Sequence, residues 1–295
     1  MNDIKYGRKR NGIKLELKKK IEDWLSSIDD EGLRDKVRKD VIVTGGSIAS
    51  MLLGEKVNDF DLYFRTFNTA KAIAEYYVAK FNKTKPELEP EVRCTEDRVK
   101  VFIQSAGVAA ESFDFEEQTE AYLDGLSEAE GKKEKYRPVF LSENAITLSD
   151  KVQLCIRFWG ESDKIHENYD FVHATCSWDH KNEELRLPPE ALECLLSRTL
   201  IYQGSLYPMA SIFRMKKFIE RGWRISAGQQ LKIMWQISEL DLTDTNVLYE
   251  QLTGVDMNYM FMLKQALANE ELLPEQFNAH YVGEVIDRIF QETMR

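Results

Sequence analysis

The sequence predicts an α+β fold, in which a mixed sheet with an N-terminal helical segment is followed by an all-helical domain. Up to residue 187, short β-branched and apolar runs are mixed irregularly with helical patterns, which favours a mixed sheet over a doubly wound one. From Pro188 onward apolar residues recur almost only at helical spacing. The 295 residues are 43% hydrophobic, enough to bury a substantial core. We therefore expect two domains, 1–187 and 188–295.

The N-terminus is predicted to form two helices and a buried strand. Residues 14–28 place apolar side chains at helical spacing opposite a lysine-rich side, which indicates an amphipathic helix. A second helix is expected over residues 31–39. The β-branched run 41–43 leads into Thr44-Gly45-Gly46, so it predicts a strand that feeds a tight turn.

A short helix, a strand and a longer helix are predicted next. Ser47 is expected to cap a helix over residues 48–53 that stops at Gly54. Residues 58–64 alternate apolar and polar side chains, as in a strand with one buried face. Residues 69–82 have helical spacing. Further strands are expected at 98–103, 138–141, 145–148, 152–158 and 170–175.

The remaining predicted features are an insertion and a series of helices. Residues 106–136 are rich in Glu, Ala, Gly and Lys, so we expect a surface insertion or mobile loop. The helical domain begins at the leucine-rich stretch after Pro188. Its later helices are expected at 207–222, 228–239, 256–268 and 281–293.

Charge is distributed unevenly along the chain. The formal net charge is −10, yet residues 1–39 hold 12 Lys and Arg against 8 Asp and Glu. Residues 111–135 hold 3 Lys against 9 Asp and Glu. Because Lys and Arg supply most of the affinity for phosphate backbones, a polyanionic partner is neither excluded nor demanded.

The cysteines and the hydropathy pattern point to the cytoplasm. Cysteines occur singly, at positions 94, 155, 176 and 194, so neither a disulfide framework nor a cysteine-paired zinc site is indicated. The polar, basic N-terminus does not predict a secretion signal. No stretch approaches the roughly 18 apolar residues that span a bilayer.

Two carboxylates on one predicted strand indicate a metal site. Asp59 and Asp61 are two positions apart, so on a strand their side chains point the same way. Phosphoryl transfer uses divalent cations to stabilise charge on the attacking and leaving oxygens. Carboxylate oxygens suit Mg²⁺ or Mn²⁺. The alternative is a solvated acidic edge of a sheet.

The turn Gly45-Gly46-Ser47 fits a phosphate group. Glycines let backbone N–H groups approach phosphate oxygens, and the helix that follows offers its positive N-terminal end. The Ser47 hydroxyl adds one contact. Each signal alone is common, but here strand, Gly-Gly-Ser, short helix and Asp-Phe-Asp follow one another within about twenty residues.

The segment from Thr44 to Phe64 resembles the signature of the DNA polymerase β-like nucleotidyltransferase superfamily, in which Gly-Ser is followed by Asp-x-Asp. It looks nearest the branch that holds poly(A) polymerases and tRNA CCA-adding enzymes. Ile48, Ala49 and Ser50 stand where that branch often has an Arg-Asp pair. The resemblance implies a nucleotidyltransferase palm over residues 1–187.

The resemblance also implies a third carboxylate on a later strand, which helps to hold the metal and to activate the attacking hydroxyl. Asp170 is the first choice, because it opens the strand-like run 170–175. Asp114 is the rival, although it leads into the acidic insertion.

Two further patterns have a functional and a structural interpretation. His173, Cys176 and His180 carry metal-binding atoms, but a strand would turn the first two to opposite faces, so core packing is favoured over zinc. Lys217, with the two arginines at positions 214 and 221, forms a basic stripe on a predicted helix. The resemblance favours nucleotide binding by Arg214, Lys217 and Arg221 over a solvated face.

The sequence therefore predicts a Mg²⁺- or Mn²⁺-dependent enzyme that moves NMP from an NTP to an acceptor hydroxyl. Gly45, Gly46 and Ser47 would bind the triphosphate, Asp59 and Asp61 the metal, and Asp170 would assist the attacking hydroxyl. The first expected acceptor is a tRNA-like RNA 3′ end, on the strength of a palm followed by a helical domain and of the basic N-terminal region. A protein or small-molecule acceptor is second, and a nucleotide-binding module without catalysis is third.

Overall fold

The computed structural model describes residues 7–103, 108–110, 134–242, 244–251, 280–281, 283–284 and 287. The chain divides into two compact units, Met1–Ser197 and Arg198–Arg295. The division falls later than the expected boundary after residue 187, because helix α7 (Pro189–Ser197) packs on residues of the first unit.

An eight-stranded sheet is the centre of the first unit, with strand order β10-β9-β1-β2-β8-β7-β6-β5. β2 and β8 run parallel, and the other neighbouring pairs run antiparallel, so the predicted mixed sheet of an α+β fold is confirmed. The strands are β1 Val41–Thr44, β2 Phe60–Phe64, β5 Val108–Ala110, β6 Pro138–Ser142, β7 Ala145–Leu148, β8 Val152–Trp159, β9 Ser177–Asp179 and β10 Glu184–Arg186. A separate hairpin pairs β3 (Glu91–Cys94) with β4 (Val99–Phe102).

The sheet has one apolar face. In β2, Phe60, Leu62 and Phe64 are buried, whereas Asp61 and Tyr63 between them are half-buried and point to the other side. β8 shows the same alternation, since its even-numbered positions 152, 154 and 156 are buried. The period-two pattern of the sequence therefore decides which side chains enter the core.

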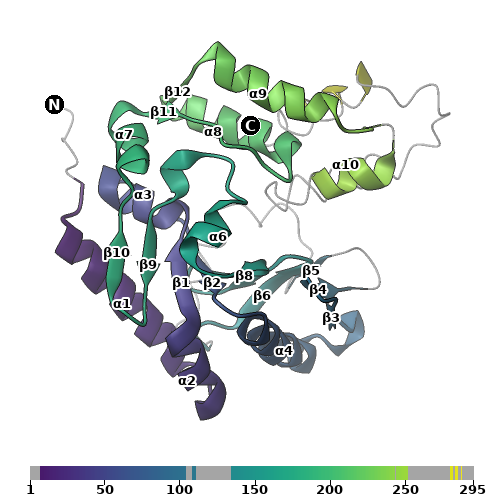
Figure 1. The fold of residues 1–295 in the computed structure, drawn as a ribbon. Coiled ribbons are helices and arrows are strands. Elements are labelled where there is room, and N and C mark those ends of the chain that lie inside the picture. The colour runs from purple at the N-terminus through teal and green to yellow at the C-terminus, as the bar shows by residue number, and fades with distance from the viewer. Residues whose placement is uncertain are drawn as a thin grey trace. The chain divides into compact units, whose positions relative to one another are not determined.

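Helices cover the apolar face. α4 (Phe67–Thr84) packs against β2, β6 and β8, and Lys20 of α1 (Arg10–Ser26) lies over the Phe60 ring. A buried hydrogen bond joins these two helices, from Trp24 Nε1 to the Tyr77 hydroxyl at 2.9 Å. Figure 1 shows α4 and the short helix α6 (Ser162–His166) on opposite sides of β2 and β8.

α2 (Glu31–Asp40) follows α1 and is capped by Asp30, whose carboxylate accepts a hydrogen bond from the Leu33 backbone N–H. A short 3₁₀ helix, η1 (Pro86–Leu88), follows α4. The helices predicted over 14–28, 31–39 and 69–82 are confirmed, with ends that differ by a few residues.

The strand predicted at residues 170–175 is wrong. Phe171 forms only an isolated bridge, and residues Val172–Ala174 form a 3₁₀ helix, η3. The Thr175 hydroxyl donates to the Val172 carbonyl at 2.8 Å, so a local side-chain bond stabilises a turn where the composition suggests a strand. The predicted insertion at 106–136 lies mostly outside the described residues; inside it, residues 108–110 form β5.

The second unit is helical where the structure describes it. It contains α8 (Pro208–Glu220), α9 (Ala227–Ser238) and α10 (Thr245–Gln251), with a two-stranded pair of β11 (Thr199–Leu200) and β12 (Arg224–Ile225). The helices predicted at 207–222 and 228–239 are confirmed. Those predicted at 256–268 and, for most of its length, 281–293 lie outside the described residues.

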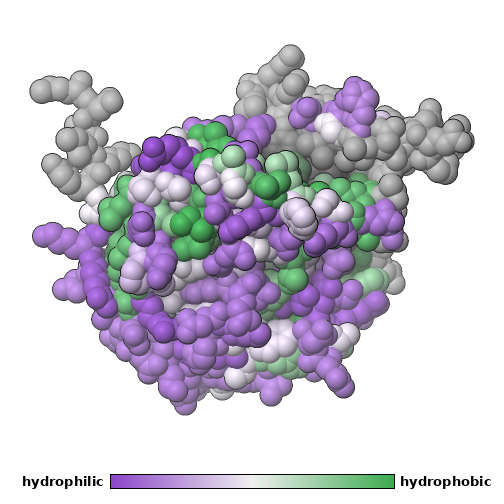
Figure 2. Space-filling model, turned by 45° about the horizontal axis from the view of Figure 1, so that its top comes forward, coloured by the Kyte–Doolittle hydropathy of each residue, from purple (hydrophilic) through white to green (hydrophobic). Residues whose placement is uncertain are grey.

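Exposed large apolar side chains are concentrated in the second unit. They include Ile212 and Ile219 on α8 and Leu231, Met234 and Trp235 on α9. Figure 2 shows hydrophobic atoms gathered in the upper part of the view and hydrophilic atoms dominating its lower part. Within the described ranges, no helix has both the length and the apolar character needed to cross a bilayer.

Candidate functional site

The site begins at the turn between β1 and α3 (Gly46–Leu53). Gly45 is the N-cap of α3 and has φ 95° and ψ −153°, a conformation that only glycine adopts readily. Its backbone N–H donates to the Ala174 carbonyl at 3.2 Å, which ties the turn to η3. α3 ends as predicted at Gly54, which is left-handed with φ 70°.

Asp61 points at this turn. Thr44 and Asp61 are directly paired in the antiparallel ladder of β1 and β2, so the residue after Thr44 lies beside the Asp61 side chain. A Cβ atom placed on Gly45 would lie 2.7 Å from Asp61 Oδ2. The carboxylate therefore occupies space that only a glycine at position 45 leaves open.

Asp59 lies just before β2 and is exposed. Its charge reaches the same side of the sheet as that of Asp61. The pKa of the Cys155 thiol is raised well above its usual range, first by burial, then by the negative charges of Asp61 and Asp59. The negative charges of both carboxylates therefore influence the same thiol, that of Cys155 on β8.

Ser47 does not cap α3, because Gly45 holds the N-cap position and no side chain bonds there. Ser47 lies in the first turn of the helix and is 2% exposed. In the part of the chain that the structure describes, its buried Oγ has no hydrogen-bond partner. An unsatisfied buried hydroxyl typically costs about 1–3 kcal/mol, so this atom favours a ligand that supplies an oxygen.

Two tyrosines that are not among the predicted site residues flank the carboxylate. The rings of Tyr63 and Tyr169 have centroids 6.1 Å apart, and the Tyr169 hydroxyl lies 3.6 Å from the position of a Cβ on Gly45. Burial raises the pKa of both phenols well above the usual value, and the charge of Asp61 adds to it. Both side chains are therefore neutral hydroxyl groups. Alternation along β2 could have indicated Tyr63, but nothing local indicates Tyr169.

A buried hydrogen-bond chain supports the turn from behind. Thr44 Oγ1 donates to the Cys176 carbonyl at 2.9 Å and lies 2.7 Å from His166 Nε2. Because the threonine hydroxyl has a single proton, His166 must be the donor of the second bond. Burial lowers the pKa of His166 to about 4, so the ring is neutral near pH 7 and carries its proton on Nε2.

Asp170 lies in a bend before η3 and is 9% exposed. It follows Tyr169, whose side chain faces Asp61, but it does not lie on a strand next to β2. Among the residues that the structure describes, no three His, Cys, Asp or Glu side chains are gathered so as to hold a metal ion. Asp114, the rival third carboxylate, lies outside the described residues.

The His-Cys-His pattern is dispersed by the fold. His173 is buried in η3, and His180 Nε2 lies 2.9 Å from Glu22 Oε1 on α1. Cys176 is buried, and burial raises the pKa of its thiol to about 12. These residues pack the first unit in the described structure.

The predicted basic stripe lies on α8 in the second unit. Lys217 and Arg221 are exposed and Arg214 is half-buried, so Arg214, Lys217 and Arg221 stay a prediction for nucleotide binding. Trp223, which follows this stripe in the chain, is 3% exposed and packs edge-on against Phe218, with ring centroids 5.2 Å apart.

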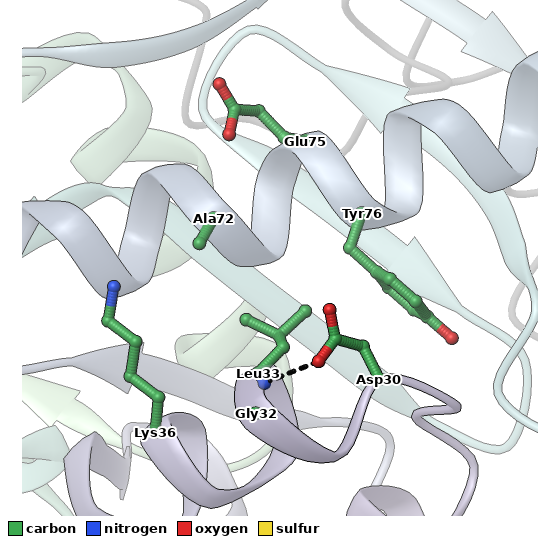
Figure 3. A pocket seen from close by; sticks show the side chains of 7 residues that line it. All are labelled: Asp30, Gly32, Leu33, Lys36, Ala72, Glu75 and Tyr76. Carbon is green, nitrogen blue, oxygen red and sulfur yellow. Dashed lines mark hydrogen bonds between the residues drawn. The ribbon is translucent and has the colours of Figure 1, made fainter.

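A shallow pocket of about 380 Å³ lies between α2 and α4, away from the glycine turn. Figure 3 shows the Asp30 carboxylate turned back to cap α2 and the Tyr76 ring along one wall. It contains none of the residues selected from the sequence. Its lining residues are Asp30, Gly32, Leu33, Lys36, Ala72, Glu75 and Tyr76.

The class of protein that the fold defines is an α+β protein, whose mixed sheet sets an Asp-x-Asp segment against a glycine turn. The chain belongs to the Gabija anti-defense 2 family, whose model matches residues 15–198. The protein "Gabija anti-defense 2" of Bacillus phage SPbetaL7 is 20% identical over 254 residues. That match covers 85% of this chain and 49% of the phage protein, so the chain spans about half the length of this curated relative.

Several solved structures of CCA-adding enzymes are similar to this chain over part of their length. The Thermotoga maritima enzyme complexed with tRNA matches 84% of this chain and 53% of its own, at 13% identity and a TM-score of 0.36. A CCA-adding enzyme with ATP matches 89% of this chain and 57% of its own, at 13% identity and a TM-score of 0.41. The Bacillus stearothermophilus enzyme in complex with CTP matches 84% of this chain and 52% of its own, at 10% identity and a TM-score of 0.39.

Proposed function

We propose that this chain is a metal-dependent nucleotidyltransferase that moves NMP from an NTP to an acceptor hydroxyl. The observation that carries the proposal is the position of Asp61 Oδ2, 2.7 Å from where a Cβ on Gly45 would lie. A triphosphate bound at the N-terminus of α3 would have this carboxylate beside it. The backbone N–H groups at the turn and the Ser47 hydroxyl supply donors to the phosphate oxygens.

The residues present fit a divalent cation. Asp59 lies just before β2 and Asp61 within it, two positions apart, and the charges of both raise the pKa of Cys155. Carboxylate oxygens are the ligands that Mg²⁺ and Mn²⁺ prefer, and two carboxylates with substrate phosphates are a common Mg²⁺ set. When bound, such an ion would neutralise charge on the phosphates.

The chain's own residues would orient the reacting groups. The acceptor oxygen forms a bond to the α-phosphorus while the bond from that phosphorus to the bridging oxygen breaks, and pyrophosphate leaves. Asp170 is the proposed acceptor of the hydroxyl proton, with Asp114 as its rival. The neutral Tyr63 and Tyr169 hydroxyls lie beside Asp61 without adding charge to the site.

The acceptor that we propose first is an RNA 3′ end, in line with the resemblance of residues 44–64 to the poly(A) polymerase and CCA-adding branch. The family name favours a role against the Gabija defence. A protein of that defence is therefore the second candidate acceptor.

The test incubates the purified chain with each α-³²P-labelled NTP, Mg²⁺ or Mn²⁺, and either total RNA or total protein. We expect label in the RNA fraction, lost in Asp61→Asn and in Asp59→Asn. Asp97→Asn is the matched control, because Asp97 is an exposed carboxylate in the turn between β3 and β4. Label in the protein fraction would replace the RNA acceptor with a protein one, and unchanged incorporation in Asp61→Asn would refute the assignment.

A nucleotide-binding module without transfer is the second candidate function. It is favoured by one observation: in the described ranges no third His, Cys, Asp or Glu joins Asp59 and Asp61. Equilibrium binding of a labelled NTP, measured beside incorporation, separates the two. Binding that Asp61→Asn abolishes, with no incorporation into any fraction, would select the module.

The cellular role has its own test. Cells that carry Gabija are infected with a Gabija-sensitive phage while they express the chain, Asp61→Asn or Asp97→Asn. We expect plaque numbers to recover with the wild type and with Asp97→Asn only. Recovery with Asp61→Asn would show that any anti-defence role is independent of this site.

A further inference from the structure

Gln153 is the residue of β8 that faces the carboxylate strand. β2 and β8 are parallel neighbours, and the Cα of Gln153 pairs with that of Asp61. The buried residues on either side of Gln153, Val152 and Leu154, point into the core, so Gln153 points to the same side of the sheet as Asp61. Strands lie about 4.8 Å apart, which brings the carboxamide within reach of the Asp61 carboxylate.

Among the described residues, a third protein ligand at this site would be a group other than a carboxylate. No third His, Cys, Asp or Glu accompanies Asp59 and Asp61 in the described structure. The next residue of β8 on the same side is Cys155, whose sulfur is a soft ligand and therefore a poor match for a hard cation. An amide carbonyl oxygen is a good ligand for Mg²⁺, Mn²⁺ and Ca²⁺.

We propose that the Gln153 side-chain carbonyl is the third protein ligand of the divalent cation held by Asp59 and Asp61. This inference rests on the proposed function, because it concerns the same metal. Two carboxylates and one amide carry a total charge of −2, whereas three carboxylates would carry −3. The protein alone therefore binds the cation weakly, and the phosphates of the nucleotide complete the site.

The test measures Mn²⁺ binding directly, from the electron paramagnetic resonance signal of free Mn²⁺ titrated with the full chain, with and without NTP. Gln153→Glu adds a carboxylate of the same shape, so we expect Mn²⁺ affinity without NTP to rise by about tenfold or more. Gln153→Met keeps the side-chain length but removes the oxygen, and we expect at least about a tenfold loss. Gln153→Ala is the second variant if Met disturbs the fold, which thermal unfolding reports.

Thr147 provides the matched control. Thr147 lies on β7, the other neighbour of β8, and its Cα pairs with that of Gln153. It is therefore one strand further from Asp61 than Gln153 is. Thr147→Val should leave Mn²⁺ affinity unchanged. Wild-type affinity in Gln153→Glu and in Gln153→Met, while Asp61→Asn loses binding, would overturn the role of Gln153 and leave the proposed function intact. Wild-type binding in Asp61→Asn would overturn both.

Discussion

Asp61 Oδ2 lies where it would collide with any side chain at position 45, 2.7 Å from an ideal Cβ on Gly45. The contact therefore links two parts of the proposed site. One is the turn that would bind phosphate, and the other is the carboxylate that would bind the metal. Two neighbouring glycines differ sharply in this respect. Gly45 has φ +95° and this contact, whereas nothing lies within 4 Å of a Cβ on Gly46.

Gly45→Ala should therefore damage both stability and the site. We expect a loss of roughly 1–3 kcal/mol in the free energy of unfolding, from the positive φ and the displaced carboxylate. NTP binding should fall with it. Urea unfolding and equilibrium NTP binding measure the two effects, and Gly46→Ala is the control that should change stability little. Equal stability of the two variants would contradict the described turn.

Ser47→Ala should separate stability from binding. Removing a buried hydroxyl that has no partner in the described structure should leave the free protein as stable as before, or more stable by up to about 1 kcal/mol. NTP affinity should drop by about tenfold, since one hydrogen bond to a charged phosphate is lost. Thermal unfolding with and without NTP measures both the stability of the free protein and its affinity for NTP. A less stable free protein would mean that Ser47 Oγ has a structural partner.

His166 should make stability depend on pH. Burial lowers its pKa in the folded chain to about 4, from the ordinary histidine value of 6.5. Between these values the unfolded chain binds more protons, so stability is fully present above about pH 6.5 and is lost as the pH falls towards 4. One proton changes stability by at most about 1.4 kcal/mol per pH unit.

The measurement for His166 is urea unfolding at several pH values from 4 to 7. His166→Gln keeps a donor for Thr44 but cannot titrate, so its stability should fall less steeply over this range. Carboxylates such as Asp179, whose pKa is lowered although its own burial opposes that shift, contribute equally to both proteins. Identical slopes would show that folding does not shift the pKa of His166.

The buried bond between Trp24 and Tyr77 should be a stability determinant far from the site. Tyr77→Phe removes the acceptor of Trp24 Nε1 and should lower the free energy of unfolding by about 1–3 kcal/mol. Tyr76→Phe, next in the chain, removes two exposed hydrogen bonds with Asp29, one accepted from its backbone N–H and one donated to its carboxylate, and should cost less than about 0.5 kcal/mol. Guanidinium unfolding of the two variants tests the contrast.

Periodicity alone located most elements of the first unit. The helix over 14–28 and the strand over 58–64 are governed by which face is apolar, and that pattern is written in consecutive residues. Where a local side-chain bond competes with composition, as at Thr175, the prediction of a strand failed. β9 and β10 have only three residues each, too few for a pattern to identify.

The sequence by itself determined the glycine turn, the Asp-x-Asp pair and the order in which they occur, because each is a matter of spacing within about twenty residues. Only the tertiary structure decided what surrounds them. Tyr169 and Gln153 are more than ninety residues from Asp61 in the chain, and each meets it through a loop or a parallel strand pairing that no local pattern encodes. Contacts between strands and loops that are distant in the sequence decide which residues line the site, so those residues can be named only once the fold is known.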